Sequence, residues 1–81
     1  MPDVLRLKGY RFFFYSNEGS PREPPHIHVE RGDDDAKFWI GEDPPRLADS
    51  HGFSAHELLA IARIVAEHRT MMEDRWHGHF R

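Results

Sequence analysis

Hydrophobic and polar positions alternate along short stretches in the first half of the chain. Residues 4–8 alternate, and a strongly apolar stretch over 10–16 follows Gly9, with Phe at three consecutive positions. We expect two short strands that turn at Lys8-Gly9, with a single strand bulged at Gly9 as the alternative. Because the Phe run makes both faces of the second strand apolar, that strand should lie inside the sheet.

The most regular alternation follows a pair of prolines at positions 24 and 25. In a strand over 26–31, the two His and the Glu share one face, and Ile27 and Val29 share the other. The prolines fix the backbone ahead of this strand and cannot donate to a ladder. An acidic turn and a further strand over 36–40 are expected next.

The second half of the chain predicts a loop and then a helix. Residues 41–52 include Pro44-Pro45, so we expect a loop in which 46–48 forms a single helical turn. Ser54 and Glu57 match a capping box, which begins a helix over about 55–76. At ~1.5 Å per residue this helix is roughly 33 Å long and should outrun strands of roughly 17–20 Å. Its apolar stripe consists of Leu58, Ile61, Ala62, Val65, Met72 and Trp76.

These elements predict an α+β fold in a single domain over 1–81: a small antiparallel sheet of three to four strands with one long C-terminal helix packed on one face. The side facing the helix should hold Leu5, Leu7, Tyr10, Phe12, Phe14, Ile27, Val29, Ala36, Phe38 and Ile40. The opposite side should hold Arg6, Lys8, Arg11, Phe13, Tyr15, His26, His28, Glu30, Lys37 and Trp39. One helix covers one face, so the second face is open or docked against another molecule.

Composition narrows the functional classes. The 81 residues include no Cys, which excludes a disulfide framework and a thiolate metal site and favours a reducing compartment. No stretch is apolar enough for a membrane span, so a cytoplasmic location is expected. A net charge of −3 argues against binding nucleic acid over the whole surface and leaves a local basic face open. Seven His residues are the outlier.

The sheet face that holds His26, His28 and Glu30, called the His face below, could carry ribonuclease chemistry. His26 and His28 are the candidate acid and base, because an unperturbed imidazole titrates near ~6.5. Arg11, together with Lys37 or Arg6, would hold the phosphate and its developing charge. Unpaired bases could stack on three aromatic candidates, Phe13, Tyr15 and Trp39. The alternative is that these rings fill a partner interface.

Metal binding is a second possibility for the same face. His26 and His28 present two imidazoles from one strand, and the third ligand would be Glu30, His51 or His56. Zinc or nickel would suit such a site, whereas the ribonuclease interpretation needs no cofactor. The spacing is weakly specific.

A third interpretation is a binding module without chemistry. Met71, Met72, Trp76 and Phe80 make the C-terminal part more apolar than a free helix end requires. We expect Trp76 to be buried by a partner protein or by a second copy, in a homodimer through the C-terminal helix. The alternative is that this end folds back onto residues 41–52.

Three runs of sequence carry a resemblance to a known family: Arg11 to Glu18, Glu23 to Val29 and Gly52 to Leu58. They resemble short bacterial proteins grouped as domain of unknown function 4160, over nearly the whole chain. Members are often encoded beside a second small protein, and some are proposed toxins of toxin-antitoxin pairs. The resemblance brings no catalytic residues. It implies a cognate antitoxin-like partner and favours a toxin acting on RNA.

Overall fold

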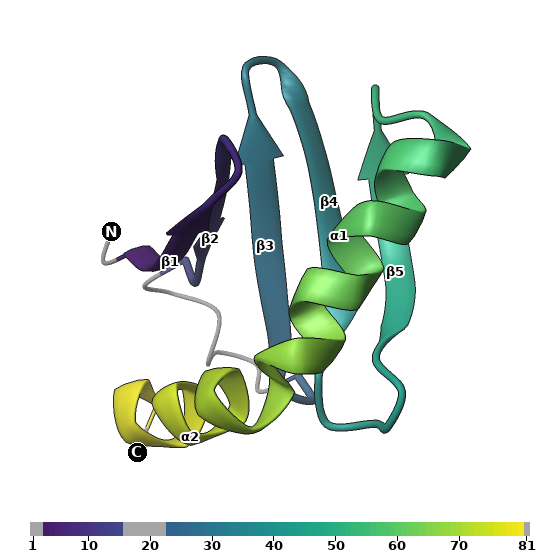
Figure 1. Cartoon of the computed structure of the whole chain (residues 1–81). Helices are drawn as coiled ribbons and strands as arrows, with labels where there is room; N and C mark the ends of the chain where they lie inside the picture. Colours follow the sequence, from purple (N-terminus) through teal and green to yellow (C-terminus); the bar gives the residue numbers. More distant parts are fainter. Residues whose placement is uncertain (1–2, 16–22, 81) are drawn as a thin grey trace.

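The computed structural model describes residues 3–15 and 23–80 as an α+β fold with one sheet and two helices (Figure 1). The strands are β1 (Asp3–Leu7), β2 (Tyr10–Phe13), β3 (His26–Arg31), β4 (Asp34–Trp39) and β5 (Arg46–His51). They pair antiparallel in the order β1-β2-β3-β4-β5, so each strand lies beside its neighbours in sequence. The helices are α1 (Ala55–Glu67) and α2 (Arg69–His79).

The number of strands and helices differs from the expectation. The described residues form five strands rather than three or four, because 46–51 is an edge strand and not a loop with a helical turn. The pairing of β5 with β4 shifts register between Lys37 and Phe38 of β4, so Ala48 of β5 has no partner on β4. This bulge breaks the alternation that would have identified the strand. The expected strand over 26–31 is confirmed. The ends of the other expected strands differ from the observed ones by a few residues, and residue 16, the expected end of the second strand, lies outside the described residues.

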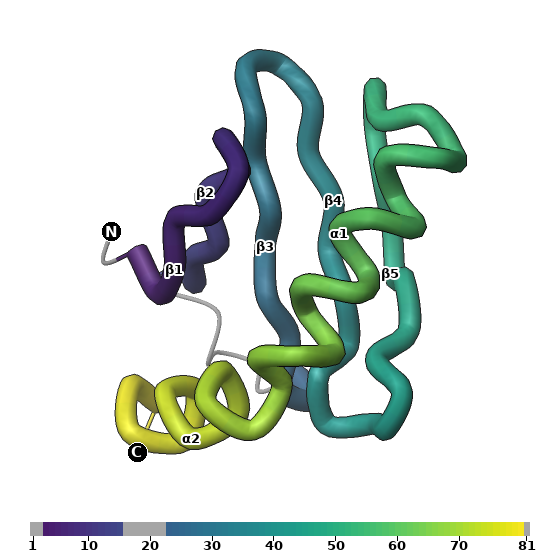
Figure 2. The backbone as a smooth tube through the Cα atoms, in the orientation of Figure 1, coloured from purple at the N-terminus to yellow at the C-terminus, as the bar shows by residue number. Residues whose placement is uncertain are grey.

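Two tight turns set the sheet's register. Lys8 and Gly9 both have positive φ, 55° and 84°, and Leu7 pairs with Tyr10, which confirms the hairpin turn expected there. The longer β3–β4 hairpin turns through Gly32, where φ is 60°. Figure 2 shows this hairpin reaching past the β1–β2 hairpin.

The start of α1 is as predicted. The Ser54 hydroxyl accepts from the Glu57 N–H at 3.1 Å, and the Glu57 carboxylate accepts from the Ser54 N–H at 3.0 Å. Both bonds of the capping box are therefore present, and they satisfy backbone donors that the first helical turn leaves unpaired. Phe53 and Leu58 pack against the core on either side of this cap.

The single long helix expected over 55–76 is two helices separated at His68. The backbone there leaves helical geometry, with φ −111° and ψ 13°, and the His68 Nδ1–H donates to the Ile64 carbonyl at 2.8 Å. α1 crosses one face of the sheet, and α2 turns away beneath the ends of the first strands (Figure 1). The bend keeps Met72 and Trp76 in contact with the sheet instead of beyond it.

One core lies between the helices and the sheet. The ten side chains expected on this side are found there, Leu5 and Leu7 being only partly buried. Trp76 is 2% exposed within this chain alone, with its ring 5.4 Å from Phe14 and 4.2 Å from Phe80. The expectation that Trp76 needs a partner or a second copy to bury it is therefore wrong, and the reason for expecting a homodimer through the C-terminal helix is removed.

Candidate functional site

The sheet face opposite the helices carries most of the polar and aromatic residues expected from the alternation, His26 and Lys8 being the exceptions. Neighbouring strands align them in a row across the sheet, because Phe13 pairs with His28, His28 with Lys37, and Lys37 with Asp49. We call these four residues the central row. In β2, β3 and β4 the residues on either side of the row point into the core, so the row faces away from both helices.

The β2 end of the row is an aromatic cluster. Phe13 is only 2% exposed although it lies outside the helix-facing core. The Arg11 guanidinium lies 4.0 Å from its ring centroid, and the His28 ring stacks on it at 5.7 Å. Tyr15 packs edge-on against both Phe13 and His28, at 5.1 and 4.5 Å, and remains 44% exposed. Phe13 is therefore a support for this cluster, whereas Tyr15 presents its ring to solvent.

His26 lies beside the cluster but inside the protein. It is 0% exposed, its Nδ1–H donates to the Pro24 carbonyl at 3.0 Å, and its ring is 4.7 Å from Trp76. The expectation that His26 and His28 are presented together on an accessible face is wrong for His26, because α2 wraps around this end of β3. The two rings are 5.1 Å apart, yet only the half-buried His28 reaches the surface.

The cations on this face already have carboxylate partners. Arg11 donates to Asp3 at 2.8 Å and to Glu30 at 3.1 Å, and Lys37 donates to Glu23 at 2.7 Å. The hydrogen bond from Arg11, followed by that from Arg6, holds the pKa of Asp3 below its usual value. An anionic ligand would have to compete with these carboxylates.

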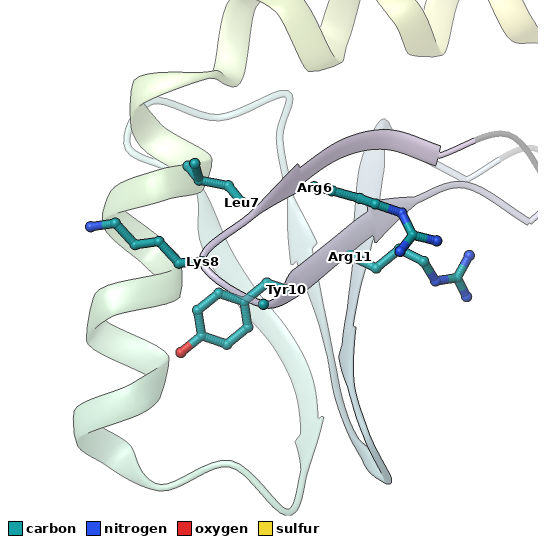
Figure 3. Close-up of a pocket in the computed structure, with 6 residues that line it drawn as sticks. Arg6, Leu7, Lys8, Tyr10 and Arg11 are labelled. Atoms are coloured by element: carbon teal, nitrogen blue, oxygen red, sulfur yellow. The ribbon is translucent and has the colours of Figure 1, made fainter.

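Figure 3 shows how the β1–β2 hairpin divides its side chains. Arg6 and Arg11 lie side by side away from the helix, and Leu7 and Tyr10 point toward it. Lys8 also points toward the helix side, so it does not join the open face as expected. The left-handed backbone of the turn places it there.

Strand β5 adds Asp49, which the sequence interpretation missed, and places His51, which was expected only as a possible metal ligand, beside Asp35. Asp35 and His51 pair across β4 and β5, and the His51 Nδ1–H donates to Asp35 at 3.1 Å. This hydrogen bond, helped by the negative charge of Asp49, raises the pKa of His51. Asp49 and His51 are two positions apart, which is the strand signal that the expected loop obscured.

A shallow hollow of about 210 Å³ lies between the aromatic cluster and β5. Its lining includes Tyr15, His28, Lys37, Asp35 and Asp49. The volume is below the roughly 300–1,000 Å³ of a pocket for a drug-sized molecule. The hollow therefore suits one group of a longer ligand, such as a base or a side chain.

Two further candidates, Trp39 and His56, do not line this hollow. Trp39 is partly exposed, and the Lys37 ammonium lies 4.6 Å from its ring. His56 lies in the first turn of α1. In residues 3–15 and 23–80, no group of three or more His, Cys, Asp or Glu residues is placed to hold a metal ion. The alternative ligand set of His26, His28, Glu30 and His56 is thus not assembled.

Comparison with known proteins places the chain in a family. The model of Domain of unknown function (DUF4160) matches residues 9–77, so the chain belongs to this family, as the three sequence runs indicated. No curated protein and no solved structure matches the chain. Neither helix of the described residues is long and apolar enough to cross a membrane.

Proposed function

We propose that this DUF4160 protein is the toxin of a bacterial toxin-antitoxin pair and acts on RNA in the cytoplasm through the open face of its sheet. The observation that carries the proposal is the exposed Tyr15 ring beside the central row, 4.5 Å from the His28 ring, with Lys37 as the neighbour of His28 on β4. A cation beside exposed rings is the combination that binds unpaired nucleotides. The proposed toxin role of some relatives supports the assignment to such a pair.

Single-stranded RNA is the nucleic acid that this face suits best. Bases that are not paired can stack on exposed rings, and Tyr15 and the partly exposed Trp39 provide two such surfaces. Lys37 lies next to the Trp39 ring and could contact the phosphate between two stacked bases. The net charge of −3 and the paired cations make a purely electrostatic mode of binding weak.

If the RNA is cleaved, His28 is the general base. It would take the proton of a 2′-hydroxyl, which then attacks the adjacent phosphorus while solvent protonates the departing 5′-oxygen. Arg11 would stabilise the negative charge that develops on the phosphate. His26 is omitted from this scheme, because its ring has no exposed surface and its Nδ1 is held by Pro24.

The proposal is tested by expressing the protein in a bacterial host and following growth. Wild-type protein should arrest growth, and His28→Ala should relieve the arrest while His56→Ala, which changes an exposed imidazole on α1, leaves it unchanged. The purified variants should show the same order when RNA cleavage is measured in chelator. Cleavage that requires added zinc or nickel would instead favour a metal mechanism.

RNA binding separates the toxin proposal from a binding module. Tyr15→Ala should weaken the affinity for a single-stranded oligonucleotide by about tenfold, since base stacking contributes roughly 1–3 kcal/mol per base. Tyr15→Phe keeps the ring and should bind nearly as well as the wild type. A protein that arrests growth and binds no RNA would show that the open face docks a protein.

A further inference from the structure

A second surface lies where β5 meets α1, and it borders the open face along the edge of the sheet. β5 is at the end of the strand order, so its outer edge has no neighbouring strand in the described sheet (Figure 1). Five of its six residues are exposed. An edge of this kind presents backbone N–H and C=O groups that another extended chain can pair with.

An apolar groove runs along this edge on the helix side. It has a volume of about 300 Å³ and is lined by Phe38, Pro45, Leu47, Ala55, Leu58, Leu59 and Ala62. Leu47 is 40% exposed and Leu59 is 63% exposed. These are two of the three large hydrophobic side chains that are exposed in residues 3–15 and 23–80, so the exposed apolar surface is concentrated here.

The other side of the same edge is acidic. Leu47 pairs with Phe38 and faces the groove, whereas Asp49 pairs with Lys37 and faces the open side. The Asp49 side chain is 67% exposed, and that of Asp35 behind it is 58% exposed. The only Arg on β5, Arg46, is held by Glu42 at 3.0 Å. His51 donates to Asp35 at 3.1 Å and lies 3.9 Å from Asp49, so this imidazole partly offsets the two carboxylates. The more exposed Asp49 is the carboxylate that a cationic side chain of a partner can reach.

We propose that β5 accepts an extended segment of a partner protein as an additional strand, with aliphatic side chains in the Leu47–Leu59 groove and Lys or Arg side chains opposite Asp49. The unpaired edge requires an extended backbone, because only a strand can satisfy a row of alternating donors and acceptors. The side chains of an added strand alternate between the two faces. One set therefore enters the groove and the other meets the carboxylates.

The test uses a synthetic peptide of about seven residues, the length of an ordinary strand, in which Val alternates with Lys. Binding to the full chain is measured by titration, and the contact residues are located from backbone amide shifts in NMR spectra. We expect the shifts at 46–51 and around Leu59. The same peptide with Glu in place of Lys should bind more weakly.

Two variants and two modified peptides make the test specific. Leu59→Lys should weaken binding by about tenfold or more, as the loss of an anchor side chain commonly does. Ala60→Lys adds the same charge at the next exposed position and should change affinity little. Asp49→Lys should reverse the preference between the Lys and Glu peptides. In one modified peptide the odd-numbered backbone nitrogens are methylated, and in the other the even-numbered ones. Only one of the two peptides should lose binding, because an added strand pairs along one of its edges and uses only every second N–H there.

Several outcomes would overturn the proposal. Equal binding by both methylated peptides would show that no strand is added, and shifts centred on β1 would place the peptide at the wrong edge. Concentration-dependent self-association that Leu59→Lys abolishes would identify a second copy of this chain as the occupant. Absence of binding by the unmodified peptide would also overturn it. The Leu59→Lys and methylated-peptide results are independent of RNA binding, because the groove lies on the helix side of the sheet. Asp49 belongs to the central row, so Asp49→Lys is used to judge peptide preference only.

Discussion

At the scale of single residues, His26 and His28 show how neighbouring identical side chains acquire different roles. Both follow the same alternation on β3, so the sequence predicts that they share a face. α2 then covers His26 with Trp76 and leaves His28 at the surface beside Tyr15. Which imidazole stays accessible therefore depends on a helix some fifty positions later, which no local pattern reveals.

We expect His26→Ala to lower the free energy of unfolding by about 2–4 kcal/mol. The change empties a fully buried site and leaves the Pro24 carbonyl without its donor. Urea denaturation of the variant measures the effect, with His56→Ala as the exposed control, for which a change within about 0.5 kcal/mol is expected. A His26→Ala protein as stable as the control would mean that the ring contributes nothing to the junction with α2.

His51 provides a pH-dependent prediction. Its pKa is raised by the hydrogen bond to Asp35 and by the charges of Asp49 and Asp35. The pairing stabilises the folded chain fully at pH values below the ordinary His pKa of about 6.5, and this stabilisation is lost as the pH rises through the raised value. An NMR titration should show His51 protonating above the ordinary value, and Asp35→Asn should lower its pKa. Equal pKa values in both proteins would contradict the interaction.

At the scale of elements, α2 is held by the protein's own core. Trp76 contacts Phe14, His26 and Phe80 within one chain. We expect Trp76→Ala to reduce stability by about 3–5 kcal/mol, the usual cost of truncating a buried aromatic ring. Denaturation measures this cost, and Leu59→Ala is the control because that side chain is exposed. Sedimentation should show the same molecular mass for both variants and the wild type, whereas dissociation of a dimer in Trp76→Ala would indicate an intermolecular role.

The elements that the sequence predicts well are those whose signals are local. The Ser54–Glu57 capping box and the Lys8-Gly9 turn are each formed by residues within a few positions of one another, and both are found where expected. β5 was missed because Pro44-Pro45 suggested a loop and the bulge at Ala48 disrupted the alternation. The break at His68 was missed because an apolar stripe specifies which face of a helix is buried and not whether the axis bends.

For the candidate site too, the sequence predicts the features that depend on local pattern and not those that depend on distant residues. Side chains of β2, β3 and β4 could be assigned to the open face because alternation fixes their direction. Asp49 and His51 could not, because their strand was not recognised. The charge balance of the site also depends on pairs of residues that are distant in sequence, such as Arg11 with Glu30, and only the register of neighbouring strands reveals these pairs.

At the scale of the whole molecule, the charge distribution limits how RNA could bind. The chain has 11 Lys and Arg against 14 Asp and Glu, and the Arg residues of the open face are neutralised by nearby carboxylates. Long-range attraction of RNA is therefore weak. Affinity would depend on stacking and on cations released from their present partners.

This balance leads to a prediction for Glu30→Gln, which removes one carboxylate that holds Arg11. Once it is released from Glu30, Arg11 can contact a phosphate, so the affinity for single-stranded RNA should rise. The slope of log K against log salt concentration should steepen by about 0.7, which is the increment for one phosphate contact. Glu67→Gln changes the net charge equally at an exposed position on α1 and should leave the slope unaltered. Fluorescence anisotropy at several salt concentrations measures both quantities. If both variants gain the same RNA affinity, RNA responds only to net charge and the open face is not its binding site. If only Glu30→Gln gains affinity, the phosphate lies beside Arg11.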